Sequence, residues 1–153
     1  MAEIKIRRAK SEDLDRVKSV TRQAYKIPIK PHGFVTRVAE PGTLRRDIAD
    51  DRLSILVAVT DARIVGAIRY EATDNDIYLF KLAVLKTFRK RGVASLLVGA
   101  VEKAAKKGGY GTVRLDCVEE KGLSAYYQKL GYGIDRVIDH GFYHGVYMSK
   151  KIR

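Results

Sequence analysis

A chain of 153 residues with 46% hydrophobic and 31% charged residues is long enough for a substantial core, and residues 1–153 are expected to form a single domain. No apolar run approaches the roughly 18 residues that a membrane-spanning helix needs, and the first residues lack the apolar core of a signal peptide, so a membrane protein is not expected. The single cysteine, Cys117, excludes an internal disulfide and favours a reducing compartment, by default the cytoplasm.

The charge of the chain is strongly basic. Thirty Lys and Arg against eighteen Asp and Glu give a formal net charge of +12. This balance favours anionic partners such as phosphorylated cofactors, acidic substrates, nucleic acid or anionic lipid. A solvated basic surface with no particular partner explains the same composition, so charge alone does not choose between these classes.

Apolar periodicity predicts a succession of strands and helices. Alternating residues near the start indicate a half-buried strand, and Ser11 is a suitable N-cap for the helix that follows. Pro and Gly make Tyr25–Pro41 irregular, and Thr43 can cap the next short helix. The expected elements are strand 3–9, helix 11–24, helix 43–50, strands 54–60, 64–70 and 77–84, a long helix ending at Gly108, strand 112–118, helix 122–130, and strands 134–138 and 143–148.

The chain is organised around Leu82–Ser95, which begins as an apolar strand, passes through a cationic loop and opens the long helix. A strand running into a helix start presents unpaired N–H groups and the positive end of the helix dipole, which suit phosphate. Arg89–Arg91 add positive charge, and Gly92 and Ala94 keep side chains small where a ligand would approach the backbone. We interpret the loop as the holder of a cofactor diphosphate; a solvated basic loop is the alternative.

Two motifs resemble those of the GCN5-related N-acetyltransferase (GNAT) superfamily. Arg89-Lys90-Arg91-Gly92-Val93-Ala94 matches its pyrophosphate loop, Arg/Gln-x-x-Gly-x-Gly/Ala. Tyr127-Gln128-Lys129-Leu130-Gly131-Tyr132 matches the Tyr-x-x-x-Gly-Phe/Tyr ending of its second signature helix. The motifs occur in the right order, and the resemblance covers about Glu3 to Lys150. It implies an α/β (α+β) fold of the GNAT type, with a mixed, mostly antiparallel sheet flanked by helices.

The resemblance implies acetyl-CoA as donor and an amine as acceptor. The expected cofactor-binding residues are Leu82, Ala83, Val84, Arg89, Lys90, Arg91, Gly92, Val93, Ala94 and Ser95. The backbone of Leu82–Val84 would pair with the pantetheine arm as an added strand does. The N–H groups of Arg91–Ser95 would hold the pyrophosphate, and an N–H near Val84 could polarise the thioester carbonyl.

Tyr127 is the expected general acid, because it occupies the family's tyrosine position. Expelling CoA leaves a thiolate whose parent thiol has a pKa of roughly 8.5, which a phenol within hydrogen-bond distance could protonate. The alternative is a core tyrosine, since aromatic residues at helical spacing usually pack in the core. The adjacent Tyr126 is expected to be structural.

The sequence departs from the family pattern at three positions. Lys86 stands where the family often has Pro, and Glu120 stands where it usually has Asn, so one cofactor contact differs. Phe80 occupies the position at which some members carry a Glu as general base. The candidates for another base are Glu71, Asp116 and Glu119. Each is otherwise a plain surface carboxylate, and a water chain could serve instead.

The remaining reactive side chains point to no second chemistry. The histidines, His32, His140 and His144, are expected to be unpaired surface residues, and no Cys, His and carboxylate cluster has metal spacing. Cys117 is expected to be a buried small apolar residue. We therefore expect no metal and no covalent intermediate.

The resemblance predicts direct transfer of acetyl to an amine of an unidentified small molecule, peptide or protein. The acceptor should bind near Tyr25–Pro41 and the last hairpin, where loops leave room for specificity. One alternative is a non-catalytic CoA-binding domain. Another, a nucleic-acid-binding protein using the basic loop and the Lys150–Arg153 tail, lacks a recognition-helix pattern. A homodimer is left open.

Overall fold

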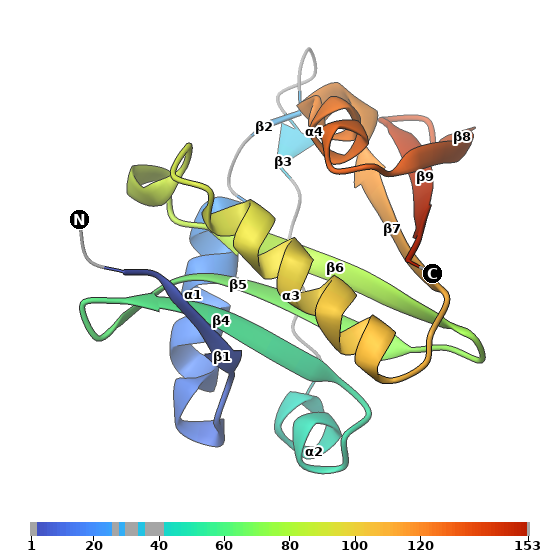
Figure 1. Ribbon diagram of the computed structural model, residues 1–153. Coiled ribbons are helices and arrows are strands. Elements are labelled where there is room, and N and C mark those ends of the chain that lie inside the picture. The colour runs from blue at the N-terminus through green and yellow to red at the C-terminus, as the bar shows by residue number, and fades with distance from the viewer. Residues whose placement is uncertain (1–2, 26–27, 30–33, 36–41, 153) are drawn as a thin grey trace.

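Seven strands of the chain form one sheet with helices on both faces (Figure 1). The computed structural model describes residues 3–25, 28–29, 34–35 and 42–152. Its elements are β1 (Lys5–Arg8), α1 (Leu14–Ala24), β2 (Pro28–Ile29), β3 (Phe34–Val35), α2 (Leu44–Ala49), β4 (Ser54–Thr60), β5 (Arg63–Ala72), β6 (Asp76–Val84), α3 (Val93–Lys107), β7 (Thr112–Val118), α4 (Leu123–Lys129), β8 (Gly133–Asp139) and β9 (His144–Lys151). Short 3-10 turns occupy η1 (Ser11–Asp13), η2 (Lys86–Phe88) and η3 (Glu119–Lys121).

The strand order is β1-β4-β5-β6-β7-β9-β8. Every neighbouring pair in the sheet is antiparallel except β6 and β7, which are parallel. The crossover between these two strands is α3, as a parallel connection requires. The predicted fold class, a mixed and mostly antiparallel sheet flanked by helices, is confirmed. β2 and β3 form a separate two-stranded pair.

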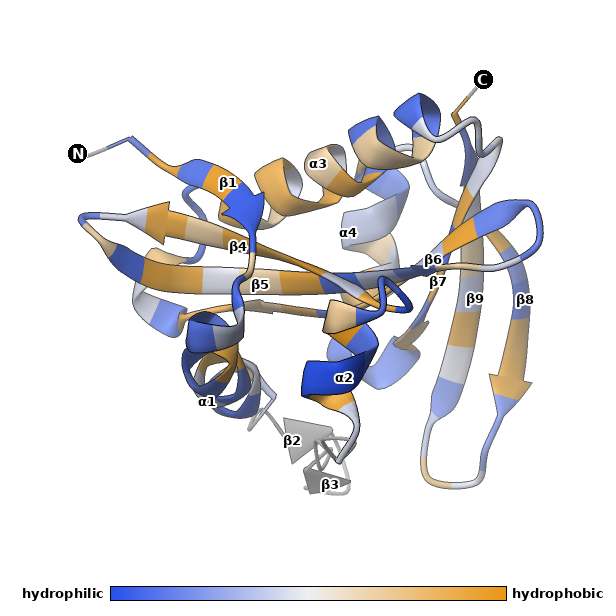
Figure 2. Cartoon of the chain, turned by 90° about the horizontal axis from the view of Figure 1, so that it is seen from below, coloured by the Kyte–Doolittle hydropathy of each residue, from blue (hydrophilic) through white to orange (hydrophobic). Residues whose placement is uncertain are grey.

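The core lies on both faces of the central strands. Figure 2 shows α3 on one side of the sheet and α1 and α2 on the other, with hydrophobic residues along β4 and β5 between them. Helix α1 buries one apolar face through Leu14, Val17 and Val20. The apolar run of β4 is covered from both sides, so that Val57 and Ala58 are 0% exposed. No helix in the described ranges combines the length and the apolar character needed to cross a bilayer.

The first helix begins differently from the sequence-based expectation. Ser11 is not its cap, because the chain enters α1 through η1 and Ser11 already lies inside that turn. Asp13 instead accepts a hydrogen bond from the Lys10 backbone N–H at 2.7 Å. Arg7 donates to the same carboxylate at 2.8 Å, and this bond holds the pKa of Asp13 below its ordinary value. A charge-assisted contact therefore replaces the expected serine cap.

Two further expectations are corrected in the segment before β4. The stretch Tyr25–Pro41 was expected to be irregular, but it contains the short strands β2 and β3; its other residues after Tyr25 lie outside the described residues. Thr43 precedes α2 as expected, yet its hydroxyl donates to Asp47 Oδ2 at 2.8 Å and caps no backbone N–H. The predicted bounds of β4 and β7 are confirmed, and those of the other main strands hold within a few residues.

Two adjacent leucines of α3 test the packing of this core. Leu97 is 0% exposed, whereas Leu96 is 46% exposed. Leu97→Ala should lower the free energy of unfolding by about 2–5 kcal/mol, because it leaves a cavity under the helix. Leu96→Ala should change it by less than about 0.5 kcal/mol. Urea unfolding of both variants checks the difference, and equal losses would contradict this placement of α3.

Candidate functional site

The central parallel pair of strands separates part of the way along the sheet. Asp76–Tyr78 of β6 pair with Thr112–Arg114 of β7, and beyond these residues the two strands diverge (Figure 1). β6 stays paired with β5 as far as Val84. Within the described part of the chain, Leu79–Val84 thus has one edge without a strand partner. Backbone groups on such an edge can pair with an extended ligand as if it were another strand.

A β-bulge interrupts β6 at the same place. Phe80 pairs with Arg69 and Ala83 with Ala67, so Lys81 and Leu82 together stand opposite one residue of β5. Lys81 has a φ of +50°, in the left-handed region that a non-glycine residue adopts uncommonly. A bulge re-aims the side chains around it. Here the residues before, in and after the bulge all contribute to one cavity wall.

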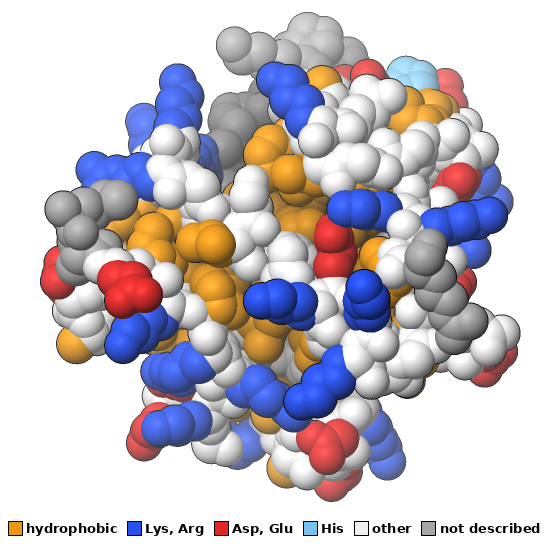
Figure 3. All heavy atoms as spheres, in the orientation of Figure 1, with side chains coloured by type: hydrophobic (Ala, Val, Ile, Leu, Met, Phe, Trp, Pro, Cys, Tyr) orange, Lys and Arg blue, Asp and Glu red, His pale blue; other side chains and the backbone are white. Residues whose placement is uncertain are grey.

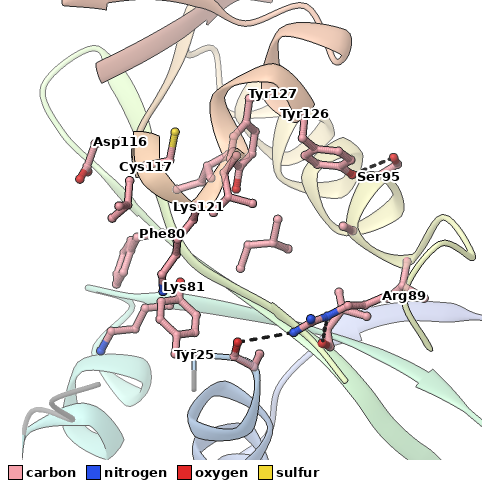
Figure 4. A pocket seen from close by; sticks show the side chains of 18 of the residues that line it. Tyr25, Phe80, Lys81, Arg89, Ser95, Asp116, Cys117, Lys121, Tyr126 and Tyr127 are labelled. Carbon is pink, nitrogen blue, oxygen red and sulfur yellow. Dashed lines mark hydrogen bonds between the residues drawn. The ribbon is translucent and has the colours of Figure 1, made fainter. Parts of the chain in front are cut away.

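The wedge between the diverging strands opens into a cavity of about 1150 Å³. Its wall is built from the end of α1, β6, the loop before α3, the first turn of α3, the end of β7 and α4 (Figure 4). On the face shown in Figure 3, hydrophobic side chains gather toward the middle, and Lys and Arg side chains surround them. The aromatic residues of the wall are Tyr25, Tyr78, Phe80, Phe88, Tyr126, Tyr127 and Tyr143.

The start of α3 forms one end of this cavity. Gly92 precedes the helix with a φ of +79°, and its carbonyl accepts the Leu96 N–H at 3.0 Å. The N–H groups of Val93, Ala94 and Ser95 have no intrahelical acceptor, and no other described residue accepts from them. These three residues line the cavity. With the positive end of the helix dipole, they can bind a phosphate group.

The three cationic side chains of the loop, Arg89, Lys90 and Arg91, make different contacts. Arg89 Nε donates to the Val84 carbonyl at 3.2 Å and its Nη2 to the Ala24 carbonyl at 3.5 Å, so its charged end joins the loop to β6 and α1 (Figure 4). Arg91 lies over the Phe88 ring, 5.4 Å from the ring centroid. Lys90 lines the cavity and forms no ion pair with a described residue. Arg89 and Lys90 line the cavity and Arg91 does not, so only part of the loop charge is available to a ligand there.

Tyr127 projects from α4 into the cavity (Figure 4). Its side chain is 6% exposed, and this burial raises the pKa of the phenol far above its ordinary value. Its ring meets those of Tyr126 and Tyr132 edge-on, at centroid distances of 5.6 and 6.0 Å. Tyr127 thus remains a protonated phenol held in place by its neighbours, and such a group can donate a hydrogen bond or a proton to a nearby anion.

Tyr126 has a contact that the sequence did not predict. Its hydroxyl lies 3.0 Å from Ser95 Oγ, so a hydrogen bond joins α4 to the first turn of α3 across the cavity (Figure 4). Both residues belong to the cavity wall. This bond fixes the distance between the tyrosine helix and the helix start, which the two sequence motifs describe separately.

The three carboxylates considered as bases lie in different surroundings. Asp116 lines the large cavity and accepts a hydrogen bond from the Tyr78 hydroxyl. Burial, followed by this bond, raises the pKa of Tyr78 well above its ordinary value. Glu71 lines a smaller adjoining cavity, and Glu119 accepts a hydrogen bond from Ser124 Oγ at 3.1 Å. Of the three carboxylates, Asp116 alone is part of the large cavity wall. The ring of Phe80 stacks on the ring of Tyr78, which is the hydrogen-bond partner of Asp116, with 5.5 Å between the ring centroids.

The histidines only partly follow expectation. His144 was expected to be unpaired, but its Nδ1 lies 3.2 Å from Glu120 Oε2, and this bond raises the pKa of the imidazole. Glu120 also accepts the His144 backbone N–H at 2.7 Å, so the carboxylate that replaces the family's Asn is bound to β9. His140 lies 3.5 Å from the Tyr147 hydroxyl, and His32 lies outside the described residues.

Cys117 lines the cavity but has little nucleophilic character. Burial raises the pKa of its thiol to about 12, so the thiolate that would attack an acyl group is scarce near neutral pH. The expectation of a buried cysteine is confirmed. Among residues 3–25 and 42–152, no group of three or more His, Cys, Asp and Glu side chains is arranged to hold a metal ion.

The structure brings most of the predicted cofactor residues to one wall. Leu82, Val84, Arg89, Lys90 and the segment Gly92–Ser95 line the same cavity as Tyr127. The Ala83 side chain is buried in the core, and Arg91 lies outside the wall. Tyr25 and Tyr143 also line the cavity, and they belong to the two segments expected near the acceptor. The wall residues that the sequence did not single out include Lys81, Phe88, Lys121 and Leu123. They come from elements far apart along the chain, and no motif or spacing within one segment signals them.

Comparison with known proteins assigns the family. The family model described as "Acetyltransferase (GNAT) domain" matches residues 17–144. This chain therefore belongs to the GNAT acetyltransferase family. Membership of this family supports the assignment of the chain to the acyltransferases. No curated protein matches its sequence.

Solved structures share the fold at low sequence identity. A GNAT-family acetyltransferase from Streptococcus pneumoniae has a TM-score of 0.76 and 20% identity, with 99% of this chain and 100% of that chain covered. PaiA N-acetyltransferase from Thermoplasma acidophilum, in complex with coenzyme A, has a TM-score of 0.77 and 20% identity, with 97% of this chain and 99% of that chain covered. The ribosomal-protein-S18-alanine N-acetyltransferase from Escherichia coli has a TM-score of 0.77 and 15% identity, with 98% of this chain and 94% of that chain covered.

Two glycines flank the first half of α3 and test the backbone at its start. Gly92→Ala should lower the free energy of unfolding by about 1–2 kcal/mol, because a Cβ is disfavoured at the positive φ of +79° even though space is open around it. Gly99→Ala, inside the helix and also with open space, should raise it by about 0.5–1 kcal/mol. Thermal unfolding of both variants measures the sign of each change in the free energy of unfolding. A stabilised Gly92→Ala variant would contradict the left-handed start of the helix.

Proposed function

We propose that this protein is an N-acetyltransferase that moves acetyl from acetyl-CoA directly to a primary amine. The observation that carries the proposal is one cavity that combines an unpaired strand edge, an open helix start and a buried phenol. Each of these suits a different part of acetyl-CoA: the pantetheine amides, the diphosphate and the thioester sulfur. Membership of the GNAT family and the coenzyme A complex of the similar PaiA enzyme support the same donor.

The donor half of the proposed site consists of β6 and the loop. Leu82–Val84 would pair through their backbone with the amides of the pantetheine arm, in the manner of an added strand. The N–H groups of Val93, Ala94 and Ser95 would bind the diphosphate, and the cavity-lining Lys90 adds positive charge beside them. Arg89 takes an indirect part, since its bonds to two carbonyls hold the loop against β6 and α1.

Tyr127 is the proposed proton donor. As the acceptor nitrogen forms its bond to the acetyl carbon, the carbon–sulfur bond breaks and the electron pair leaves with sulfur. A thiolate whose conjugate acid has a pKa of roughly 8.5 is stabilised by a phenol that donates to it. Burial of Tyr127 keeps this phenol protonated, so that it can donate a hydrogen bond to the sulfur as negative charge develops there.

Asp116 is the proposed acceptor of the amine's proton. An ammonium must lose a proton before its nitrogen can attack, and Phe80 offers none of the chemistry of the glutamate found at its position in some relatives. Asp116 belongs to the same cavity wall and is held by the Tyr78 hydroxyl. The proton would pass to Asp116 directly or through water.

The proposal is tested by CoA release in the presence of acetyl-CoA and a panel of primary amines. The wild-type chain should release CoA with at least one amine. Tyr127→Phe should lower kcat by about 10²- to 10⁴-fold, because the proton donor is lost, while acetyl-CoA affinity changes little. The matched control is Tyr132→Phe, which removes a hydroxyl bonded to Glu102 at 2.9 Å and away from the cavity.

Different failures of this test have different meanings. Full activity of Tyr127→Phe would contradict the role of the phenol. Tight acetyl-CoA binding with no transfer to any amine would favour a non-catalytic CoA-binding domain. Absence of acetyl-CoA binding would contradict the proposed donor site as a whole.

A further inference from the structure

Lys121 is a cation in the wall of the large cavity whose charge the proposed donor chemistry does not use. It belongs to η3, the turn between β7 and α4. Figure 4 shows its side chain reaching into the cavity between Phe80 and Tyr127. Its Nζ lies 5.5 Å from the centroid of the Tyr25 ring. Lys121 thus lies between Tyr127, which serves the donor, and Phe80 on the facing strand β6.

No carboxylate of the described residues forms an ion pair with this ammonium. The two glutamates that precede it in η3 are bound elsewhere: Glu119 accepts from Ser124, and Glu120 holds His144. Burial without a compensating charge lowers the pKa of Lys121. The Tyr25 ring offsets part of this cost through a cation–π contact, but it does not neutralise the charge. A half-buried ammonium of this kind favours an anionic ligand.

We propose that Lys121 binds a carboxylate of the acceptor, so that the acceptor is an amine with a carboxylate close to its nitrogen, in the simplest case an α-amino acid. This inference rests on the proposed acetyl transfer in the same cavity. Lys121 is then a residue that determines specificity.

The ammonium group of such an acceptor also has a partner of opposite charge in the cavity. Asp116 supplies a carboxylate for the ammonium of the acceptor, and its hydrogen bond with Tyr78 holds it in position. Phe80 and Tyr25 offer apolar surface for a side chain. A zwitterion therefore finds a cation, Lys121, a carboxylate, Asp116, and aromatic rings within the same cavity. A simple alkylamine would leave Lys121 unpaired, so it should bind less well.

The diphosphate of the donor does not compete for Lys121 in this arrangement, because the two anion sites belong to different elements, α3 and η3. The proposed diphosphate site is the first turn of α3, which Figure 4 shows at the side of Ser95 and Arg89. Lys121 lies on the other side of Tyr126 and Tyr127, toward Phe80 and Cys117. The ammonium therefore serves the acceptor half of the cavity.

The test compares matched acceptors and matched lysine variants. Each α-amino acid of a panel is assayed beside its amide, which keeps the amine and the side chain but lacks the carboxylate. The variants are Lys121→Met, which removes the charge at similar length, Lys121→Arg, which keeps it, and Lys129→Met, which removes an exposed lysine of α4 outside the cavity. Acetyl-CoA affinity is measured for all three.

We expect the wild-type chain to prefer the acids over the amides. Lys121→Met should raise KM for the acids by about tenfold to hundredfold, the usual effect of losing a charged hydrogen bond, and should change KM for the amides by less than about threefold. Lys121→Arg should retain most of the preference, and Lys129→Met all of it. Acetyl-CoA affinity should be unchanged in every variant.

Three results would overturn the inference. These are equal use of acids and amides by the wild-type chain, an equal effect of Lys121→Met on both, or a preference for phosphorylated amines over carboxylates. If no amine is acetylated, the proposed function fails separately. Equilibrium binding of the same acids and amides to the CoA-saturated wild-type and Lys121→Met chains then still decides whether Lys121 recognises a carboxylate.

Discussion

The separation of β6 from β7 is the constraint on which the site depends. β7 pairs along its whole length with β9, from Thr112–Lys151 to Val118–Gly145, whereas it pairs with β6 only at the start. β6 in turn stays with β5 to Val84. Each strand is therefore held by its outer neighbour, and the two halves of the sheet open into a wedge. Because backbone polar groups need partners, the exposed edge of β6 is suited to bind an extended ligand with amides.

Helix packing makes this wedge a cavity with two chemically different sides. The hydrogen bond between Ser95 and Tyr126 joins α3 to α4 above the wedge, and Arg89 joins the loop to α1 below it. The side near α3 offers unpaired N–H groups and suits phosphate. The side near β7 offers Asp116 and Lys121, which suit a molecule carrying both charges. Tyr127 lies between them, where an acyl group would pass from one to the other.

The sequence predicted the parts of the structure that local pattern determines. The apolar run of β4 and the alternation of β7 gave their observed bounds, and the loop motif and the tyrosine motif led to one cavity. The direction of the Arg89 side chain was not predictable, because its acceptors are carbonyls of α1 and β6. Lys121 was missed for a related reason: its neighbours in the cavity come from distant elements, and its own segment carries no motif. The cap of α1 was misassigned because Arg7, which holds Asp13, belongs to the preceding strand.

Amide hydrogen exchange with and without CoA tests most directly whether the open edge of β6 and the start of α3 hold the donor. The account predicts slower exchange in residues 79–84 and 92–95 when CoA is bound, because pantetheine amides and diphosphate would engage N–H groups there, and little change in the β8–β9 hairpin. Unchanged exchange in both segments at saturating CoA, or protection confined to other elements, would contradict it.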